Sequence, residues 1–342
     1  MPALLLNSAM AGGVLLIAVG FSLAFCRLVM RTGIVDAPDG VRKQQDQPVP
    51  RLGGIAILAT LLLLGPVIAI SLASAPLAIP ETRLLFIVLG FTLFANVIGL
   101  WDDVATLPTS LKLLLLLGAC LTASALGLQP PVVATPFGQT ALPLILVVGS
   151  AAWLLVFTNA VNFMDGSNGM AVGCMTIMFA GLALASLEHG ALPLSLGWFA
   201  LIGACLGFLL LNVRGLIYSG DAGALGLGSL FAGLSLISGL EIWTIATLAL
   251  PFLTDVLMTL IWRARHGKPW LEPHLDHAYQ RLIAGGWTHM ETAILYWGLT
   301  ASSAVAATIA ARGGGALPFA MFCALLIAGI ALWLAHRRMQ TS

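Results

Sequence analysis

Charged residues are scarce in this sequence. Of its 342 residues, 15 are Lys or Arg and 14 are Asp or Glu, so charged side chains make up 8% of the chain, whereas a soluble domain carries roughly 25%. Hydrophobic residues make up 59%, which excludes a disordered chain, and a net charge of +1 gives no general attraction to nucleic acid. The composition therefore predicts an all-α, polytopic integral membrane protein whose function lies inside, or at the rim of, a helical bundle.

Paired cysteines and internal repeats are also missing. The cysteines all lie within apolar runs and none belongs to a CxxC pair, which favours a packing role over disulfides or zinc ligation. We find no soluble domain, so residues 1–342 are expected to form a single transmembrane helical domain. The cysteines are Cys26, Cys120, Cys174, Cys205 and Cys323.

Long apolar runs are abundant. A transmembrane helix needs about 20 mostly apolar residues, and by this criterion we predict about 11 spans, or 10 if the two runs separated only by Glu241 form one. Their ranges are 4–26, 54–73, 83–100, 111–128, 141–160, 170–187, 193–211, 224–240, 242–262, 291–311 and 316–335.

The basic residues indicate how these spans are oriented. If the N-terminus lies outside, nearly all Lys and Arg residues fall in the inner connections, and only Arg83 and Arg312 lie outside. Such a bias marks the inner side as cytoplasmic. All the aspartates fall on this side too, so the active face is predicted to be cytoplasmic. The cytoplasmic loops are expected at 27–53, 101–110, 161–169, 212–223 and 263–290.

Two adjacent carboxylates end the third predicted span. Asp102 and Asp103 lie at the membrane boundary, and Lys112 begins the next span. Neighbouring carboxylates repel each other, and a metal cation or a lysine relieves that repulsion. The alternative is a solvated helix end with a lysine whose ammonium group reaches the interface.

Two further connections combine carboxylates with glycine. The segment 159–169 contains Asn159, Asn162, Asp165 and Asn168, and the segment 219–226 surrounds Asp221 with glycines. Oxygens of Asn and Asp suit a hard cation, amides suit a nucleobase or sugar, and glycine lets a ligand approach the backbone closely. The alternative is an ordinary turn rich in Asn, Asp and Gly.

Basic residues gather in two other cytoplasmic segments. His274, His277 and Arg281 belong to a loop that could bind an anion such as a diphosphate, although two histidines beside an aspartate could also ligate a transition metal. Arg42 and Lys43 would lie at headgroup level, where they could bind a lipid phosphate or simply anchor to anionic lipid.

Asp255 lies deeper, within a predicted span. A carboxylate at that depth needs a polar cavity or a partner, so it either faces such a cavity or forms a salt link to another span.

The order of these motifs resembles a known family. Asp-Asp is followed by Asn-x-x-Asn-x-x-Asp-Gly-x-x-Gly, then Gly-Asp-x-Gly, then the His/Arg loop, from about Val35 to Arg281. The pattern is similar to the polyprenyl-phosphate N-acetylhexosamine-1-phosphate transferases, glycosyltransferase family 4. That family includes enzymes that start O-antigen, enterobacterial common antigen and wall teichoic acid synthesis, and phospho-MurNAc-pentapeptide transferase is a relative.

The resemblance implies a reaction and its partners. A sugar-1-phosphate would pass from a UDP-sugar to undecaprenyl phosphate at the bacterial cytoplasmic (inner) membrane, with release of UMP. The implied cofactor is Mg²⁺, with Mn²⁺ as a substitute, because a divalent cation must neutralise two phosphates that meet. The implied partners are the UDP-sugar, the prenyl phosphate, the bilayer and a second copy in a homodimer, with no nucleic acid.

The resemblance also implies roles for individual residues. Asp221 would be the first magnesium ligand and Asn162 the second, and Asp102, Asp103 and Asp221 would be catalytic. One of the paired aspartates would position or deprotonate the prenyl phosphate. The residues implied in substrate binding are Arg42, Lys43, Lys112, Asn159, Asp165, Asn168, His274, His277 and Arg281.

Some positions depart from the family pattern. Gln45 stands where many members have His, Ala224 replaces a frequent Ser, and the run 274–277 is not the three-histidine run of the peptidoglycan enzyme. The segments 162–166 and 277–282 are more similar to the O-antigen-initiating branch, which predicts an N-acetylated hexosamine donor. The alternatives are phospho-MurNAc-pentapeptide transfer, a proton-coupled secondary transporter and an inactive assembly scaffold.

Overall fold

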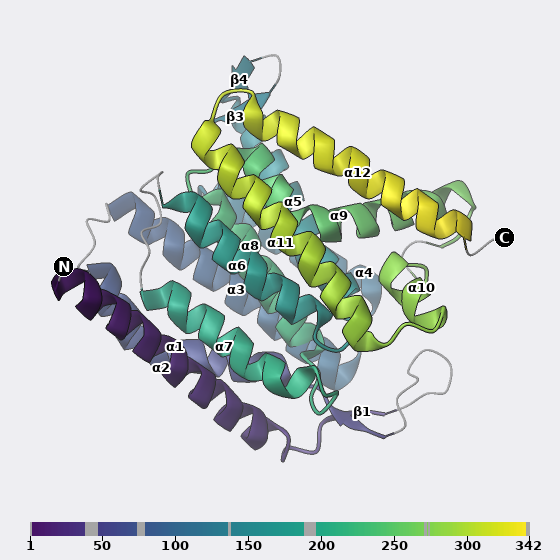
Figure 1. Cartoon of the computed structure of the whole chain (residues 1–342), viewed down its shortest axis with the longest axis horizontal. Helices are drawn as coiled ribbons and strands as arrows, with labels where there is room; N and C mark the ends of the chain where they lie inside the picture. Colours follow the sequence, from purple (N-terminus) through teal and green to yellow (C-terminus); the bar gives the residue numbers. More distant parts are fainter. Residues whose placement is uncertain are drawn as a thin grey trace.

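The computed structural model describes residues 2–37, 47–73, 79–135, 138–187, 196–269, 272 and 274–339, and this part of the chain forms a mostly helical bundle (Figure 1). Its helices are α1 (Pro2–Val29), α2 (Gly53–Ala73), α3 (Ile79–Ala105), α4 (Thr109–Ala125), α5 (Pro143–Met164), α6 (Met170–Ser186), α7 (Leu196–Asn212), α8 (Gly220–Leu236), α9 (Ile242–Arg265), α10 (Ala278–Ala284), α11 (His289–Gly313) and α12 (Leu317–Met339).

Each predicted span falls on a separate helix. Within the described residues, six helices are long and apolar enough to cross a membrane, and shorter apolar helices accompany them. These features fit a polytopic membrane protein. The six are Ala9–Val29, Thr82–Ala105, Pro143–Met164, Ile242–Arg265, His289–Gly313 and Leu317–Arg338.

Strands were not expected, and two short antiparallel pairs are present. β1 (Val35–Asp36) pairs with β2 (Val49–Pro50), and β3 (Val133–Thr135) pairs with β4 (Gly138–Thr140). Valine and threonine favour extended backbone, and both pairs lie in connections between helices. The prediction of an all-α fold is therefore wrong in these two connections, and the first of them leads directly into the candidate site.

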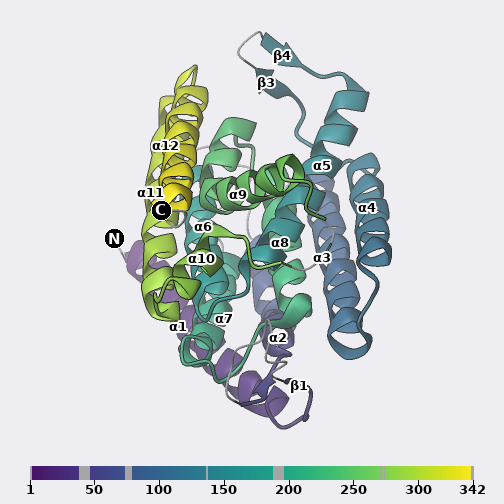
Figure 2. The ribbon, with the colours of Figure 1, turned by 90° about the vertical axis from the view of Figure 1, so that its right-hand side faces the viewer.

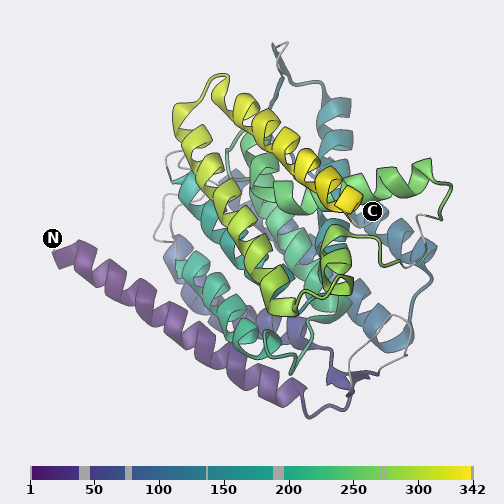
Figure 3. The same ribbon diagram turned by 45° about the vertical axis from the view of Figure 1, so that its right-hand side comes forward.

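The centre of the bundle is α8. Every residue from Ala222 to Leu236 is buried, as expected for a helix that is apolar on all sides. α8 packs along α3 and α5 and also contacts α2 and α6. α1 packs against α7 at one edge of the molecule, and α11 and α12 pack against α9 (Figures 1 and 3). All five cysteines are free, and only Cys323 is not fully buried, which confirms their packing role.

Helix direction brings the candidate residues to one end of the bundle. The C-terminal ends of α3 and α5 and the N-terminal ends of α4 and α8 meet there, because consecutive helices run in opposite directions. The β1–β2 pair lies at this end, and the β3–β4 pair lies at the other (Figure 2). This arrangement confirms that Asp102, Asp103, Asp165 and Asp221 share one rim.

Candidate active site

A lysine joins two carboxylates at this rim. Lys112 Nζ lies 2.9 Å from Asp102 Oδ2 and 2.6 Å from Asp221 Oδ2. Asp102 lies in the last turn of α3, Asp221 in the first turn of α8 and Lys112 in the first turn of α4. The second oxygen of Asp102 accepts the backbone N–H of Leu107 at 2.6 Å. The three side chains are 14% to 24% exposed, so a ligand can reach this group.

Asp103 has a different environment. Its side chain is fully buried beneath the N-terminus of α8, where Oδ1 accepts the N–H of Asp221 at 3.0 Å and Oδ2 accepts that of Ala222 at 3.1 Å. Arg51 donates to the same carboxylate from Nε at 3.0 Å and from Nη2 at 2.5 Å. A carboxylate at a helix N-terminus satisfies free N–H groups and complements the helix dipole. Asp103 therefore holds α3, α8 and Arg51 together.

Close backbone packing at this junction explains two of the glycines. A Cβ on Gly99 of α3 would lie 2.4 Å from the backbone carbonyl of Asp221, so no side chain fits there. Gly220 has a φ of +70°, and a Cβ there would lie 2.1 Å from the Arg51 carbonyl oxygen. Glycine tolerates both the conformation and the contact. The spacing between Asp221 and the aspartate pair depends on these glycines.

Asp165 follows α5 and faces the same group of charges. It is half-buried and accepts a hydrogen bond from the Ser219 hydroxyl. Burial, with the nearby charges of Asp221 and Asp103, raises the pKa of Asp165 to about 7, although the Ser219 hydrogen bond opposes this shift. A carboxyl group with that pKa holds a proton for part of the time at neutral pH.

This raised pKa predicts a pH-dependent stability. An unfolded Asp ionises near pH 3.8 while the folded carboxyl keeps its proton to about pH 7, so folding takes up a proton between these values and stability falls as pH rises. We expect the melting temperature of the ligand-free protein, relative to Asp165→Asn, to fall from about pH 4 to about pH 7 and to level off above that. Thermal melts in detergent across this range test it.

A second variant, which changes the pKa of Asp165 without removing its carboxyl group, provides a further test. Ser219→Ala removes the hydrogen bond that favours ionised Asp165, so its melting temperature relative to Asp165→Asn should continue to fall to a higher pH than that of the wild type. A difference between the wild type and Asp165→Asn that stays constant with pH contradicts the assignment.

The amide residues of segment 159–169 are not equivalent. The Asn159 side chain is buried and donates to the Leu155 carbonyl within α5. Asn162 lies half-buried in the last turn of α5, where its carbonyl accepts the Asp165 N–H, and Asn168 lies half-buried in the loop. Asn212 accepts the Gly169 N–H at 2.8 Å and donates to Ile217. Asn212 therefore ties this loop to the one that precedes Asp221.

Asp255 anchors α10 beside this loop. Its oxygens accept the backbone N–H groups of Ala278 and Tyr279 and the Tyr296 hydroxyl, the last at 2.6 Å. His277 Nδ1 lies 3.5 Å from Asp255 Oδ1. This geometry confirms that Asp255 has polar partners.

The anchored helix also contacts the loop that contains Asp165. The Tyr279 hydroxyl donates to the Phe163 carbonyl at 3.0 Å, and His277 stacks on the Phe163 ring. Asp255 therefore positions His277 next to segment 159–169.

Basic side chains also lie around the connection between α9 and α10. Asp276 pairs with Arg263 and, at 3.4 Å, with Lys268. The His274 ring lies 4.9 Å from that of His277. Burial, together with the neighbouring His277 and Arg263 side chains, lowers the pKa of His274 to about 4, so this imidazole is neutral at pH 7. Arg281 lies on α10, at the same end of the molecule.

The structure thus brings some of the predicted residues together. Asp102, Asp103, Lys112, Asp165 and Asp221 form one group, and His277 lies beside Phe163 in the loop that contains Asp165. Arg42 and Lys43 lie outside the described residues. Sequence reasoning missed the roles of Arg51, Ser219, Tyr279 and Tyr296, because each depends on a contact between distant parts of the chain.

Comparison with known proteins gives a consistent result. A model described as glycosyl transferase family 4 matches residues 84–239, the region that contains Asp102, Asp165 and Asp221. The chain is 32% identical over 286 residues, 79% of its length, to a protein of Bacillus subtilis (strain 168) named probable undecaprenyl-phosphate N-acetylglucosaminyl 1-phosphate transferase, and covers 75% of it.

Shorter matches involve a second group of proteins. The chain is 36% identical over 183 residues to the phospho-N-acetylmuramoyl-pentapeptide-transferase of Synechococcus sp. (strain JA-3-3Ab), which is 50% of this chain and 52% of that protein. For the enzyme of the same name from Listeria innocua, identity is 29% over 171 residues, 48% of this chain and 52% of that protein. The chain therefore spans only about half the length of these pentapeptide transferases.

Proposed function

The chain belongs to glycosyl transferase family 4, and we propose that it transfers an N-acetylhexosamine-1-phosphate from a UDP-sugar to undecaprenyl phosphate. The products are UMP and a lipid-linked diphosphate sugar, which would initiate O-antigen or a related cell-surface polysaccharide. The observation that carries the proposal is the group of Lys112, Asp102 and Asp221 at one rim of an apolar bundle, where a lipid phosphate and a soluble nucleotide can meet.

Mg²⁺ is the cofactor that these residues suit. The carboxylates of Asp102 and Asp221 face one cation, the Lys112 ammonium group, and Mg²⁺ binds through one or two carboxylates plus substrate phosphates. Among the described residues no group of three or more His, Cys, Asp or Glu side chains could hold a metal ion, which is consistent with a metal completed by substrate. We assign Asp221 as the first Mg²⁺ ligand and Asn162 as the second.

Bound Mg²⁺ would neutralise the phosphates that approach each other. The protein's own residues then bind and orient the substrates. The Lys112 ammonium group exchanges its contacts with Asp102 and Asp221 for a contact with the acceptor phosphate. It holds this phosphate through a charge-assisted hydrogen bond. Asp102 orients this phosphate from the end of α3. Asp103 acts indirectly, because it fixes the backbone on which Asp221 lies.

The donor would occupy the side of the site formed by segment 159–169 and α10. Asn159, Asp165 and Asn168 belong to the nucleotide region, and His274, His277 and Arg281 would bind the diphosphate or the sugar. The neutral His274 imidazole can donate a hydrogen bond to a phosphate oxygen. Arg263 and Lys268, the two basic partners of Asp276, can do so as well. We favour an N-acetylhexosamine over MurNAc-pentapeptide, because the relative of the first kind is matched over 75% of its length and those of the second over about half.

The remaining proposals concern the membrane. We propose a multi-pass protein of the bacterial inner membrane with about 11 spans, an outer N-terminus and the site at the cytoplasmic face, in agreement with the distribution of Lys and Arg. A homodimer remains part of the proposal. A secondary transporter fits less well, because Asp102, Asp103, Asp165 and Asp221 gather at one rim instead of near the midplane.

UMP release tests the proposal. Purified protein in detergent should release UMP only when undecaprenyl phosphate, Mg²⁺ or Mn²⁺, and the correct donor are all present. The donor panel is UDP-linked GlcNAc, GalNAc, QuiNAc, FucNAc and MurNAc-pentapeptide, and the preferred sugar assigns the pathway. The absence of release with every donor, from folded protein alongside an active control enzyme, would contradict the function.

A further inference from the structure

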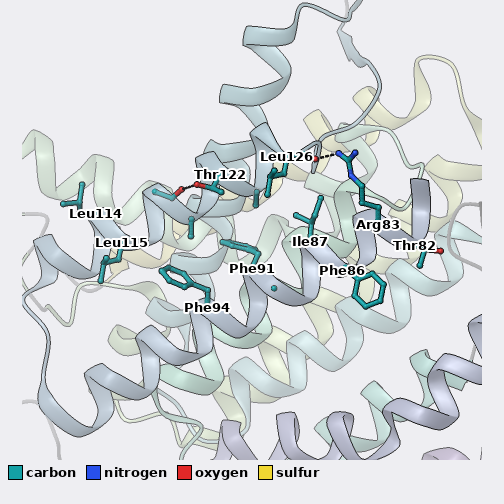
Figure 4. Close-up of a pocket in the computed structure, with 14 residues that line it drawn as sticks. Thr82, Arg83, Phe86, Ile87, Phe91, Phe94, Leu114, Leu115, Thr122 and Leu126 are labelled. Atoms are coloured by element: carbon teal, nitrogen blue, oxygen red, sulfur yellow. Dashed lines mark hydrogen bonds between the residues drawn. The ribbon is translucent and has the colours of Figure 1, made fainter. Parts of the chain in front are cut away.

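Arginine side chains near the ends of apolar helices usually extend to lipid headgroups or to water. Arg83, near the start of α3, is exposed in this way and donates to the Leu126 carbonyl at 2.5 Å, beside an apolar groove between α3 and α4 (Figure 4). Arg338, in the last turn of α12, is exposed as well. Its neighbour Arg337 is only 8% exposed. Arg337 therefore packs inside the protein, although it ends an apolar helix.

Two tryptophans hold the Arg337 guanidinium group. Its Cζ atom lies 3.3 Å from the centroid of the Trp262 ring of α9 and 4.9 Å from that of the Trp333 ring, one turn earlier on α12. A guanidinium group within about 6 Å of an aromatic ring is attracted to the face of that ring. The flat guanidinium stacks on such rings in a way that a lysine ammonium group cannot reproduce.

The same guanidinium group reaches the backbone just before His277. Arg337 Nη1 donates to the Asp276 carbonyl at 3.4 Å, a long hydrogen bond that the positive charge of the donor strengthens. The Asp276 carboxylate pairs with Arg263 and Lys268. Asp276 is thus held by α12 through its main chain and by the end of α9 through its side chain.

The position of α10 depends on contacts of this kind. The helix has 7 residues, and a helix this short is not stable by itself. Asp255 binds its first N–H groups, and α12 contacts it directly, with the C-terminal end of α12 beside it (Figure 1). His277 is the N-cap of α10, and Arg281 lies within the helix. A shift at the start of α10 would therefore move both residues.

We propose that Arg337 is a positioning residue for the donor, because it fixes the start of α10 so that His277 and Arg281 can bind the diphosphate of the UDP-sugar. This inference rests on the proposed function, in which these two residues bind the diphosphate or the sugar. Arg337 acts through the Asp276 backbone and not by contact with the substrate. Its Nη2 atom is buried without a hydrogen-bond partner among the described residues. Since an unpaired buried donor costs free energy, stability alone does not account for an arginine here.

Arg337→Met tests the proposal. Methionine can pack on the tryptophan rings, but it removes the charge and the hydrogen bond to Asp276. The KM for the UDP-sugar should rise about tenfold, the loss that corresponds to one hydrogen bond from a charged group. The KM for undecaprenyl phosphate and the turnover at saturating donor should not change, because the group of Lys112, Asp102 and Asp221 is untouched.

A conservative variant and a control complete the series. Arg337→Lys keeps the charge and a donor but loses the planar stack, so its KM for the UDP-sugar should rise only about threefold. It also tests the proposal if Arg337→Met does not fold. Arg265→Met removes the same charge from the exposed end of α9 and should behave like the wild type. A wild-type KM for the UDP-sugar in every folded Arg337 variant overturns the proposal, as does an equal rise in the KM for undecaprenyl phosphate.

Hydrogen exchange of the ligand-free protein separates this inference from the proposed function. The amides of residues 278–284 should exchange about tenfold faster in Arg337→Met than in the wild type or Arg265→Met, whether or not a donor supports turnover. Unchanged exchange in α10 overturns the positioning role, and so does faster exchange throughout the bundle, which would indicate a general loss of stability. If α10 alone exchanges faster but the wild type releases UMP with no donor, the proposed function fails while Arg337 still positions α10.

Discussion

Asp221→Asn is expected to lower turnover by about a thousandfold, a loss at the upper end of those seen for removal of one electrostatic group from an active site. The Asp221 carboxylate faces Lys112, and its backbone N–H binds Asp103. Asparagine keeps the backbone contact and the approximate side-chain shape but removes the charge that attracts a divalent cation. The variant should therefore fold normally and lose UMP release at every Mg²⁺ concentration.

The control for this variant is Glu291→Gln. Glu291 is an exposed acidic residue at the start of α11, and glutamine can replace glutamate in its capping box. It removes one negative charge outside the group of Lys112, Asp102 and Asp221 and should leave turnover unchanged. Near-normal activity of purified Asp221→Asn at saturating Mg²⁺ would exclude Asp221 as the essential ligand and would weaken the assigned reaction.

The positions of the helices could be predicted from the sequence because membrane burial imposes a local rule. Each predicted span corresponds to a helix, since about 20 apolar residues in a row are needed to cross a bilayer. The ends were less predictable. α3 continues to Ala105 and α8 begins at Gly220, so Asp102 and Asp221 lie on helices and not in the loops expected there. Hydropathy marks where the apolar segment ends, but capping contacts such as those of Asp103 determine where the helix ends.

The identity of the site residues was partly predictable from the sequence, but the different roles of the individual residues were not. The acidic and glycine-rich motifs indicated Asp102, Asp103 and Asp221, which the fold brings together. The sequence could not distinguish the two adjacent aspartates, because their difference arises from Arg51 and from the N-terminus of α8. Neither partner is near in sequence. The same reason explains why α10, and the role of Asp255 as its anchor, were not predicted.

The paired aspartates should respond differently to the same substitution. Asp103→Asn places an NH₂ group either against the donors of Arg51 and Asp221 or against that of Ala222, and breaking a buried ion pair costs about 3 kcal/mol or more. Its melting temperature should fall markedly, together with its activity. Asp102→Asn can still accept the Leu107 N–H and loses mainly a partly exposed ion pair, so it should melt near the wild-type temperature while turnover falls about a hundredfold.

A double-mutant cycle isolates the structural contribution. If Asp103 stabilises the fold through Arg51, Arg51→Gln combined with Asp103→Asn should destabilise the protein by less than the sum of the single variants, because the second change removes a partner that is already lost. Additive effects would contradict this pairing. Asp103→Asn with wild-type stability, or Asp102→Asn with an equal loss of stability, would contradict the division of roles. With the expected result, Asp102 contributes mainly to turnover, and Asp103 maintains the helix junction that holds Asp221 in place.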